Sequence, residues 1–427
     1  MALTPWRAPT ATGPVQADVR LPGSKSMMAR ALVLGALSDG PTMIRSPLRS
    51  RDSDLMAAAL KSLGTRIESA SDVEWTIEPD RLSGPADIDV GLAGTVMRFM
   101  PPVAALAVGA VTFDGDSRAR QRPLGPLLGG LRAIGVRIDA APRGDGGGLP
   151  LTVHGDGRVA GGELRIDASA SSQFVSGLLL AGARFDRGVV VRHSGPPVPS
   201  APHLRMTVAM TRAAGAAVDN STPDVWAVEP GKLVGRTWEI EPDLSGAAPF
   251  LAAALVTGGE VRVPGWPRET TQPGDQLRDL LTRMGGTATH TPHGLVVRGT
   301  GAVRGIDASL ADVSELTMVI AALAALADSP SRLTGIGHVR GHETDRLAAL
   351  ARELDRLGAR VTELSDGLAI EPKPLHGAVF QTYDDHRMAH AAAVIGLAVP
   401  GVELSDVACT SKTMPDFPAL WTRMVVG

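Results

Sequence analysis

The sequence contains few of the residues on which disulfides, metal clusters and base-stacking surfaces depend. One cysteine, Cys409, occurs in 427 residues, which excludes an internal disulfide and a cysteine-based metal cluster. Aromatic residues make up 3 %, so platforms for stacking nucleic-acid bases are not expected. The net charge of −3 also lacks the basic excess that is usual in nucleic-acid-binding proteins. Nucleic acid is therefore not expected as a partner, and any positive field for an anionic ligand must be local.

Long hydrophobic runs are absent as well. The longest apolar stretch, residues 99–113, is interrupted by Pro101 and Pro102 and is too short to span a bilayer. Residues 1–20 contain no apolar core of the signal-peptide type. We therefore expect a soluble protein without membrane contact, and the single cysteine fits the reducing conditions of the cytoplasm.

A repeat is present instead. At intervals of about seventy residues, a short polar cluster opens into a helical run rich in Ala and Leu. The clusters lie near Lys25, Thr95, Ser172, Gly246, Glu315 and His386. The N-terminus of a helix has unpaired N–H groups and a partial positive charge, so it attracts anions. Several such ends, carrying polar or cationic side chains, indicate an enzyme that acts on phosphorylated small molecules.

Second helices with the same spacing complete the repeat. They are expected to end at Gly64, Gly135, Gly215, Gly285 and Gly358, where glycine suits the left-handed residue that follows a helix. Alternating strands follow, as in residues 136–139 and 359–362. Three α/β units would form a lobe of roughly 200 residues. We therefore predict two lobes with a break near residues 237–242, and a ligand site in the cleft between them.

The first candidate binding segment is residues 21–26, followed by Arg30. Proline and glycine set a turn, Ser26 can cap the helix, and Lys25 and Arg30 point toward its start. The spacing of a P-loop is missing. A capped helix with solvated charges is the alternative, but lysine is scarce in this chain, with five lysines against 37 arginines, and Lys25 and Lys412 both lie in polar segments.

Two further segments supply possible anion-binding groups in the first half of the chain. Residues 91–98 and 118–125 combine small residues, which let backbone N–H groups approach a ligand, with arginines that bind carboxylate or phosphate. Residues 169–174 supply hydroxyl and amide groups ahead of a buried helix. A solvated rim of arginines and an ordinary serine N-cap remain the alternatives for these segments.

The second half of the chain carries the acidic candidates. Glu315 heads a strongly apolar helix, where a charged residue is disfavoured unless it is exposed, paired or functional. Residues 341–346, 384–387 and 410–413 complete the polar clusters. No metal-ligand spacing such as HExxH appears among them. For Asp345 and Arg346 a structural salt-bridge network is the favoured interpretation.

Together these motifs resemble the 5-enolpyruvylshikimate-3-phosphate synthase family of enolpyruvyl transferases. The matching segments are PGSKSMMAR (22–30), GLAGTVMR (91–98), RPLG (122–125), SSQF (171–174), GHETDRL (341–347), DHRMA (385–389) and the segment around Lys412. The resemblance implies an α/β fold of two lobes, each built from three βαβαββ units, with the active site in the cleft between them. One lobe would hold residues 1–23 and 241–427, and the other residues 24–240.

The resemblance also implies a reaction and its residues. Phosphoenolpyruvate and shikimate 3-phosphate would give 5-enolpyruvylshikimate 3-phosphate and phosphate through a tetrahedral intermediate, a step of aromatic amino acid biosynthesis. Shikimate 3-phosphate would be bound by Lys25, Ser26, Arg30, Ser171, Ser172, Gln173, Ser200, Glu315 and His342. Phosphoenolpyruvate would be bound by Lys25, Gly94, Arg122, Gln173, Arg346, Arg387 and Lys412. The implied catalytic residues are Lys25, Glu315 as the base for the 5-hydroxyl, and Glu343 as the acid that protonates the methylene carbon.

The remaining implications concern cofactors, assembly and inhibition. No metal or organic cofactor and a monomeric state are implied, and glyphosate would compete with phosphoenolpyruvate because Gly94 is present. The sequence departs from the family's common pattern at Met28, Ala29, Leu92, Glu315 and His342, of which the neutral imidazole of His342 in place of a lysine has the largest consequence for substrate binding.

Two other functions are alternatives. The sister enzyme that transfers enolpyruvyl to UDP-N-acetylglucosamine has a loop cysteine, whereas Cys409 lies far from residues 118–125. A non-catalytic protein that binds anionic metabolites would have no use for Glu315 and Glu343, because carboxylates repel anions unless they transfer protons.

Overall fold

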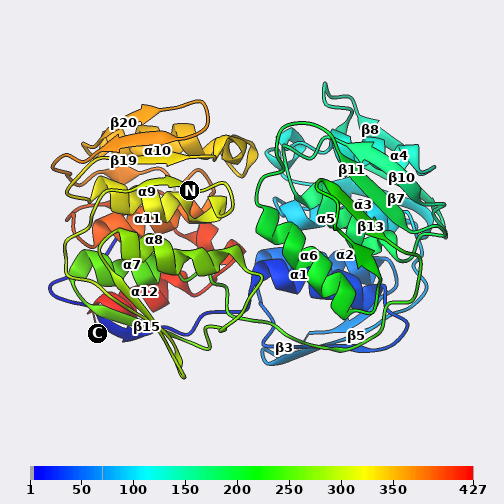
Figure 1. The fold of residues 1–427 in the computed structure, drawn as a ribbon, viewed down its shortest axis with the longest axis horizontal. Helices are drawn as coiled ribbons and strands as arrows, with labels where there is room; N and C mark the ends of the chain where they lie inside the picture. The colour runs from blue at the N-terminus through cyan, green and yellow to red at the C-terminus, as the bar shows by residue number, and fades with distance from the viewer. Residues whose placement is uncertain (1–3, 70, 427) are drawn as a thin grey trace. The chain divides into compact units, whose positions relative to one another are not determined.

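The computed structural model describes residues 4–69 and 71–426 and divides into two compact units (Figure 1). Unit 1 consists of Met1–Pro22 and Glu241–Gly427, and unit 2 of Gly23–Ile240. Residues 1–3 and 427 of one expected lobe, and residue 70 of the other, lie outside the described residues. No helix in the described part of the chain combines the length and the apolarity needed to cross a bilayer.

A βαβαββ arrangement recurs in both units and confirms the predicted fold class. One sheet has the strand order β6 (Ala86–Asp89), β7 (Val108–Asp114), β9 (Gly148–Asp156) and β8 (Arg137–Ala141). In it, β6 is parallel to β7, and β9 is antiparallel to both β7 and β8. The helix α3 (Gly94–Ala104) connects the two parallel strands, as a parallel pair requires a crossover connection. Other four-stranded sheets repeat this pattern of one parallel and two antiparallel pairings.

The strands of unit 2 form three sheets. In the order in which neighbouring strands pair, they are β14 (Thr237–Glu239), β3 (Thr42–Arg45), β5 (Glu74–Glu78) and β4 (Arg66–Glu68); β6 (Ala86–Asp89), β7 (Val108–Asp114), β9 (Gly148–Asp156) and β8 (Arg137–Ala141); and β10 (Gly162–Ile166), β11 (Val189–His193), β13 (Val225–Val228) and β12 (Val218–Asp219).

The described strands of unit 1 likewise form three sheets. In the same kind of order, they are β16 (Thr287–Thr291), β17 (Gly294–Arg298), β15 (Glu260–Pro264) and β2 (Gln16–Asp18); β18 (Asp307–Ser309), β19 (Ser331–Thr334), β21 (Leu368–Glu371) and β20 (Arg360–Glu363); and β1 (Trp6–Arg7), β23 (Glu403–Leu404) and β22 (Val379–Phe380).

Strands from distant parts of the sequence complete the sheets. Within unit 2, β14 pairs in parallel with β3, although almost two hundred residues separate them. Within unit 1, β2 pairs in parallel with β15, and β1 pairs antiparallel with β23. The first strands of the chain therefore belong to the unit that is otherwise made from its second half.

The first helix of each repeat is apolar on all sides because it is buried on all sides. These helices are α1 (Lys25–Ala36), α3 (Gly94–Ala104), α5 (Gln173–Gly182), α7 (Ala248–Thr257), α9 (Thr317–Ala325) and α11 (His386–Gly396). Their starts agree with the six polar clusters of the sequence. The expected cap of α1 was wrong, however, because Ser24 rather than Ser26 stands at the N-cap.

The second helices carry the expected glycines behind them. They are α2 (Arg51–Ser62), α4 (Gly125–Ala133), α6 (Ala201–Ala213), α8 (Leu277–Arg283), α10 (Arg346–Arg356) and α12 (Phe417–Val426). Gly64, Gly135, Gly215, Gly285 and Gly358 all have φ between 93° and 108°, the left-handed region that favours glycine.

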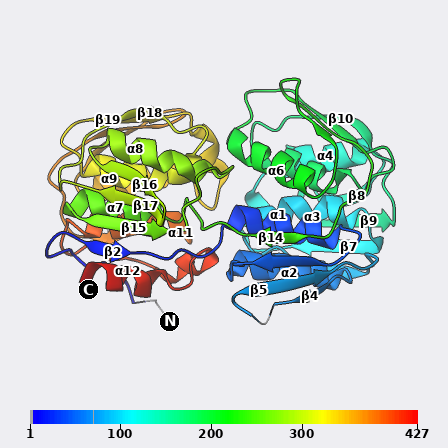
Figure 2. The same ribbon diagram turned by 60° about the horizontal axis from the view of Figure 1, so that its bottom comes forward.

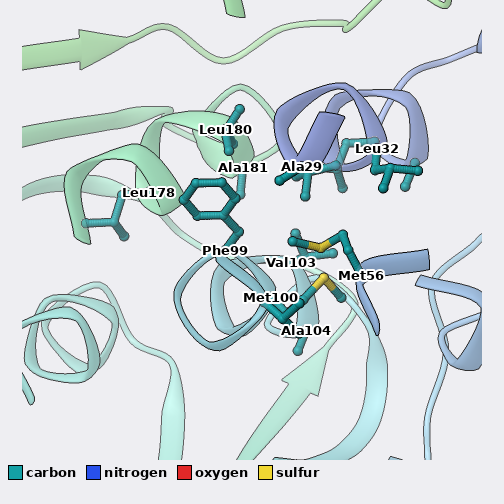
Figure 3. Close-up of a cluster of buried hydrophobic side chains, with 14 of the residues drawn as sticks. Ala29, Leu32, Met56, Phe99, Met100, Val103, Ala104, Leu178, Leu180 and Ala181 are labelled. Carbon is teal, nitrogen blue, oxygen red and sulfur yellow. The ribbon is translucent and has the colours of Figure 1, made fainter. Parts of the chain in front are cut away.

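Each unit has its own hydrophobic core. In unit 2, Figure 3 shows side chains of four helices meeting, among them Leu32 of α1, Met56 of α2, Phe99 of α3 and Leu178 of α5. In unit 1, α9 and α11 lie between the sheet of β19 and the sheet of β15 (Figures 1 and 2). Burying the apolar helices in this way leaves their polar first turns as the places where each unit can bind a ligand.

Candidate active site

The start of α1 holds Lys25 beside a buried carboxylate. Lys25 Nζ lies 3.2 Å from Oδ2 of Asp52, which is 3 % exposed, whereas about a fifth of the Lys25 side chain is accessible. Asp52 lies in the first turn of α2, within the capping box formed by Ser50 and Ser53. Sequence reasoning did not find Asp52, because its only signal is its place in an ordinary capped helix.

Arg30 is buried among neutral acceptors in unit 2. Its guanidinium donates to Ser26 O and Thr207 Oγ1, both at 2.8 Å, and to His203 O at 3.1 Å and Ser176 Oγ at 3.4 Å. Burial lowers the pKa of Arg30 to about 9. The alternative of a helix with solvated charges is therefore wrong for Arg30, which links α1 to α5 and α6 and carries positive charge into the interior.

Two more guanidinium groups lie against Gly94 at the start of α3. A Cβ added at Gly94 would lie 2.8 Å from Arg122 Nη2 and 2.9 Å from Arg98 Nη1. Arg122 donates to Leu92 O at 3.1 Å, and Arg98 donates to Gln173 Oε1 at 2.9 Å. Both arginines are buried. The alternative of a solvated arginine rim is therefore wrong for these two.

The remaining predicted residues of unit 2 lie at the starts of α5 and α6. Ser171 Oγ accepts from Gln173 N at 3.3 Å, and Ser172 is the buried N-cap of α5. Ser200, the N-cap of α6, has a left-handed backbone with φ of 54°. Because Gln173 also bonds to Arg98, the structure brings the first turns of α3 and α5 together.

In unit 1, Glu343 lies between two cations. Lys412 Nζ is 2.6 Å from Glu343 Oε1, and Arg346 Nη2 is 3.0 Å from Glu343 Oε2. All three side chains are buried. An isolated buried carboxylate would be costly, and two cations with hydrogen bonds compensate for that cost.

Arg346 is held on its other side by Asp385. Its Nε and Nη2 donate to the two oxygens of Asp385 at 2.7 and 3.1 Å. Burial alone would lower the pKa of Arg346, but Asp385 and Glu343 outweigh burial and raise it. Asp345 and Arg346 both take part in salt bridges, as expected, but not with each other, because Asp345 caps α10 through Ala348 N and pairs with Arg340.

His342 Nδ1 lies 2.9 Å from Arg346 Nη1. Since a guanidinium can only donate, Nδ1 must accept, and the ring proton of a neutral His342 is then on Nε2. His342 can therefore offer an N–H donor to a ligand.

Glu315 lies near a histidine and an arginine, of which only the arginine was expected from the sequence. It lies in η3 (Ser314–Leu316), directly before α9. Burial lowers the pKa of His338 to about 4, a shift that Glu315 partly opposes. Burial also lowers the pKa of Arg387, again opposed by Asp243 and Glu315. His338 and Asp243 were missed because neither stands out within its segment.

The starts of α7, α9 and α11 consequently meet in unit 1. Arg387 Nη1 donates to Ser245 O at 3.3 Å, which joins α11 to the turn before α7. Together with Lys412 and Arg346, these groups form a cationic cluster that can bind an anion. Among the described residues, no group of three or more His, Cys, Asp or Glu side chains is arranged to hold a metal ion.

Comparison with known proteins identifies the family. Residues 9–421 match the family of EPSP synthase (3-phosphoshikimate 1-carboxyvinyltransferase). The chain belongs to the EPSP synthase family. It therefore transfers the enolpyruvyl group of phosphoenolpyruvate to the 5-hydroxyl of shikimate 3-phosphate, as the motifs predicted.

Solved structures share the fold. Two structures of EPSP synthase from Acinetobacter baumannii are 24 % identical in sequence, with TM-scores of 0.80 and 0.79. The first alignment covers 99 % of this chain and 98 % of that chain, and the second covers 98 % of each. The enolpyruvyl transferase NikO from Streptomyces tendae is 17 % identical, with a TM-score of 0.76 over 98 % of this chain and 97 % of that chain.

Proposed function

We propose that Glu343 and Glu315 are the two proton-transfer groups of this reaction. Glu315 would accept the proton of the 5-hydroxyl while that oxygen attacks C2 of phosphoenolpyruvate. Glu343 would deliver a proton to C3, which gives a tetrahedral intermediate. Cleavage of the C–O bond to phosphate, with return of a proton from C3, would then form the enolpyruvyl product.

The contact of Glu343 with Lys412 and Arg346 carries this proposal. Two cations stabilise the ionised carboxylate, so Glu343 has no proton to donate while both contact it. An anionic substrate would replace Glu343 as their partner, because phosphate and carboxylate groups bind ammonium and guanidinium strongly. Substrate binding would thereby favour the protonated form of Glu343, which can donate its proton.

The remaining predicted residues would bind the two substrates. We propose that Lys25, which also contributes to catalysis, and Gln173 contact both. Further contacts to phosphoenolpyruvate would come from Gly94, Arg122, Arg346, Arg387 and Lys412. Shikimate 3-phosphate would additionally contact Ser26, Arg30, Ser171, Ser172, Ser200, Glu315 and His342. The buried, charge-neutral surroundings of Arg30 support this assignment, since an anion would offset the cost of burying its charge.

Release of phosphate from the two substrates tests the proposal. The wild-type protein should release one phosphate per enolpyruvyl group transferred to shikimate 3-phosphate. UDP-N-acetylglucosamine in place of shikimate 3-phosphate should give no release. If no phosphate were released with either acceptor, the protein would bind these anions without catalysis, and the assignment of both glutamates would be contradicted.

We further propose a monomer that works in the cytoplasm. The support for a cytoplasmic location is that the sequence has a single cysteine, Cys409, and so cannot form an internal disulfide. Sedimentation equilibrium of the purified chain tests the monomer, and fractionation of cells that express it tests the location.

A further inference from the structure

Tyr383 and Asp384 form an unusual turn directly ahead of Asp385. Both residues have φ of 54°, in the left-handed region that residues other than glycine rarely adopt. Asp385 N donates to Thr382 O at 2.9 Å and closes the turn. Two consecutive positive φ values are typical of a type I′ turn, in which glycine and asparagine are preferred. Contacts from outside the turn are therefore needed to hold it.

Glu353 supplies those contacts from α10. Its side chain is completely buried, at 0 % exposure. Tyr383 Oη donates to Glu353 Oε1 at 2.5 Å, and Gln381 N donates to Glu353 Oε2 at 3.0 Å. Arg356 Nε lies 3.0 Å from the same Oε2 and balances the charge. The carboxylate of Glu353 thus binds both Gln381 and Tyr383, the residues on either side of Thr382.

The same helix contacts the far end of the turn. Arg346, seven residues before Glu353 and so on the same face of α10, binds the carboxylate of Asp385. Arg346 in turn contacts Glu343, and Glu343 contacts Lys412. The segment 381–385 is therefore fixed to α10 at two places, by Glu353 at its start and by Arg346 at its end.

We propose that the Glu353–Tyr383 contact is a positioning device for phosphoenolpyruvate binding. By holding the left-handed turn, it places Asp385 so that Arg346 keeps its guanidinium in the orientation in which it binds the substrate. Neither Glu353 nor Tyr383 touches the substrate. This inference rests on the proposed role of Arg346.

Steady-state kinetics of Tyr383→Phe tests the proposal. Losing the hydroxyl should raise KM for phosphoenolpyruvate by roughly tenfold, because a small displacement of a substrate-positioning group is costly. KM for shikimate 3-phosphate should change little, since Asp385 and Arg346 are not among its proposed contacts. A contact that served only stability would lower the unfolding temperature and leave both KM values unchanged, and this result in a folded variant would overturn the proposal.

Two variants provide a matched control and a rescue. Arg356→Gln removes another partner of Glu353 without touching the turn, so its KM values should match the wild type. Asp384 is exposed, and glycine adopts positive φ without strain, so adding Asp384→Gly to Tyr383→Phe should recover part of the lost affinity for phosphoenolpyruvate. If the double variant were as impaired as the single one, the turn would not be the cause and the proposal would fail.

An optical titration separates this inference from the proposed function. Tyr383 is the only tyrosine of the sequence, so the absorbance of tyrosinate reports on it alone. Burial and the hydrogen bond to Glu353 raise the pKa of Tyr383, and Glu353→Gln should lower it toward the ordinary value. An ordinary pKa in the wild type would refute the contact whether or not the protein is active. An inactive wild type with a raised Tyr383 pKa would refute only the proposed function.

Discussion

The two glutamates proposed for proton transfer have different surroundings. Glu315 is half-buried at the start of an apolar helix, whereas Glu343 is buried between Lys412 and Arg346. A proton acceptor must be ionised and a proton donor protonated, so Glu343 suits its role only after the substrate has replaced it as the partner of Lys412 and Arg346.

Replacement of either carboxylate should therefore slow turnover more than it weakens binding. We expect Glu315→Gln and Glu343→Gln each to lower kcat by ~10²–10⁴-fold, the usual contribution of one acid or base group. Rapid-quench measurement of a single turnover checks this directly. Near-normal turnover in Glu315→Gln would contradict its assignment as the base.

Asp345→Asn is the matched control for Glu343→Gln. Asp345 is two residues away and caps α10 rather than contacting Arg346. We expect its replacement to cost at most about 1 kcal/mol of unfolding free energy, the usual size of a cap contribution, with kcat nearly unchanged. A kcat loss as large as that of Glu343→Gln would show that capping, and not proton transfer, explains both effects.

The position of Gly94 leads to a prediction about inhibition. A methyl group there would lie within 3 Å of the guanidinium tips of Arg122 and Arg98, so these buried groups would have to shift to admit it. Gly94→Ala should therefore raise the inhibition constant of glyphosate by at least ~10-fold, with a smaller rise in KM for phosphoenolpyruvate. A tenfold rise corresponds to a loss of about 1.4 kcal/mol of binding free energy.

Gly129→Ala provides the control for that experiment. Gly129 also lies in a helix, and a Cβ there would meet nothing within 4 Å. Its inhibition constant should equal that of the wild type. Equal effects of Gly94→Ala on inhibitor and substrate would contradict the prediction, because they would show that the inhibitor does not come closer to Gly94 than the substrate does.

Helix α11 buries a histidine, and this burial opposes ionisation of the imidazole ring. His390 is 1 % exposed, packs 4.6 Å from the ring of Phe417 and meets His386 edge-on at 5.8 Å. Neither ring nitrogen of His390 has a hydrogen-bond partner among the described residues. Burial, with a smaller effect of Arg387, lowers the pKa of His390 to about 3.

This makes the stability of unit 1 sensitive to mild acid. Between pH 6.5 and 3 the unfolded chain binds a proton at His390 that the folded protein does not, so stability is complete above pH 6.5 and falls as the pH falls. Between pH 7.5 and 5.5 the wild type should lose about 1.4 kcal/mol of unfolding free energy through His390. His390→Leu should not show this part of the loss. Urea unfolding at both pH values checks this, and an unchanged pH dependence would contradict it.

The elements also show what sequence can predict. Polar helix starts and the glycines behind the second helices were predictable because each follows from local backbone chemistry within a few residues. The pairing of Arg346 was not, since its true partner, Asp385, is 39 residues away whereas Asp345 is adjacent. Asp52 escaped for the same reason, because only the packing of α1 on α2 brings it to Lys25.

At the scale of the whole molecule, unit 2 is one uninterrupted segment with a core of its own. We expect residues 23–240 alone to unfold cooperatively. They should also bind shikimate 3-phosphate more weakly than the whole chain does, without turnover, because Lys25, Arg30 and the serines of α5 are retained and Glu315 is lost. Calorimetry on the isolated segment checks both statements.

Unit 1 supplies the comparison. Residues 241–427 alone lack β1 and β2, so two sheets would lose an edge strand and expose the adjacent one. Joining residues 1–22 to residue 427 through a flexible linker should restore solubility. If residues 241–427 were equally stable without those strands, the pairing of β2 with β15 would contribute little to folding.

The pairing of β1 with β23 also determines when each unit can be completed during translation. The residues of β1 must wait for Leu404, which is made almost four hundred residues later, while all of unit 2 is synthesised in between. Pro5, Pro9 and Pro14 suit this delay, since proline opposes pairing with unintended strands. A ribosome halted shortly before Leu404 should therefore carry a protease-resistant unit 2 and a leading segment that is still open to cleavage.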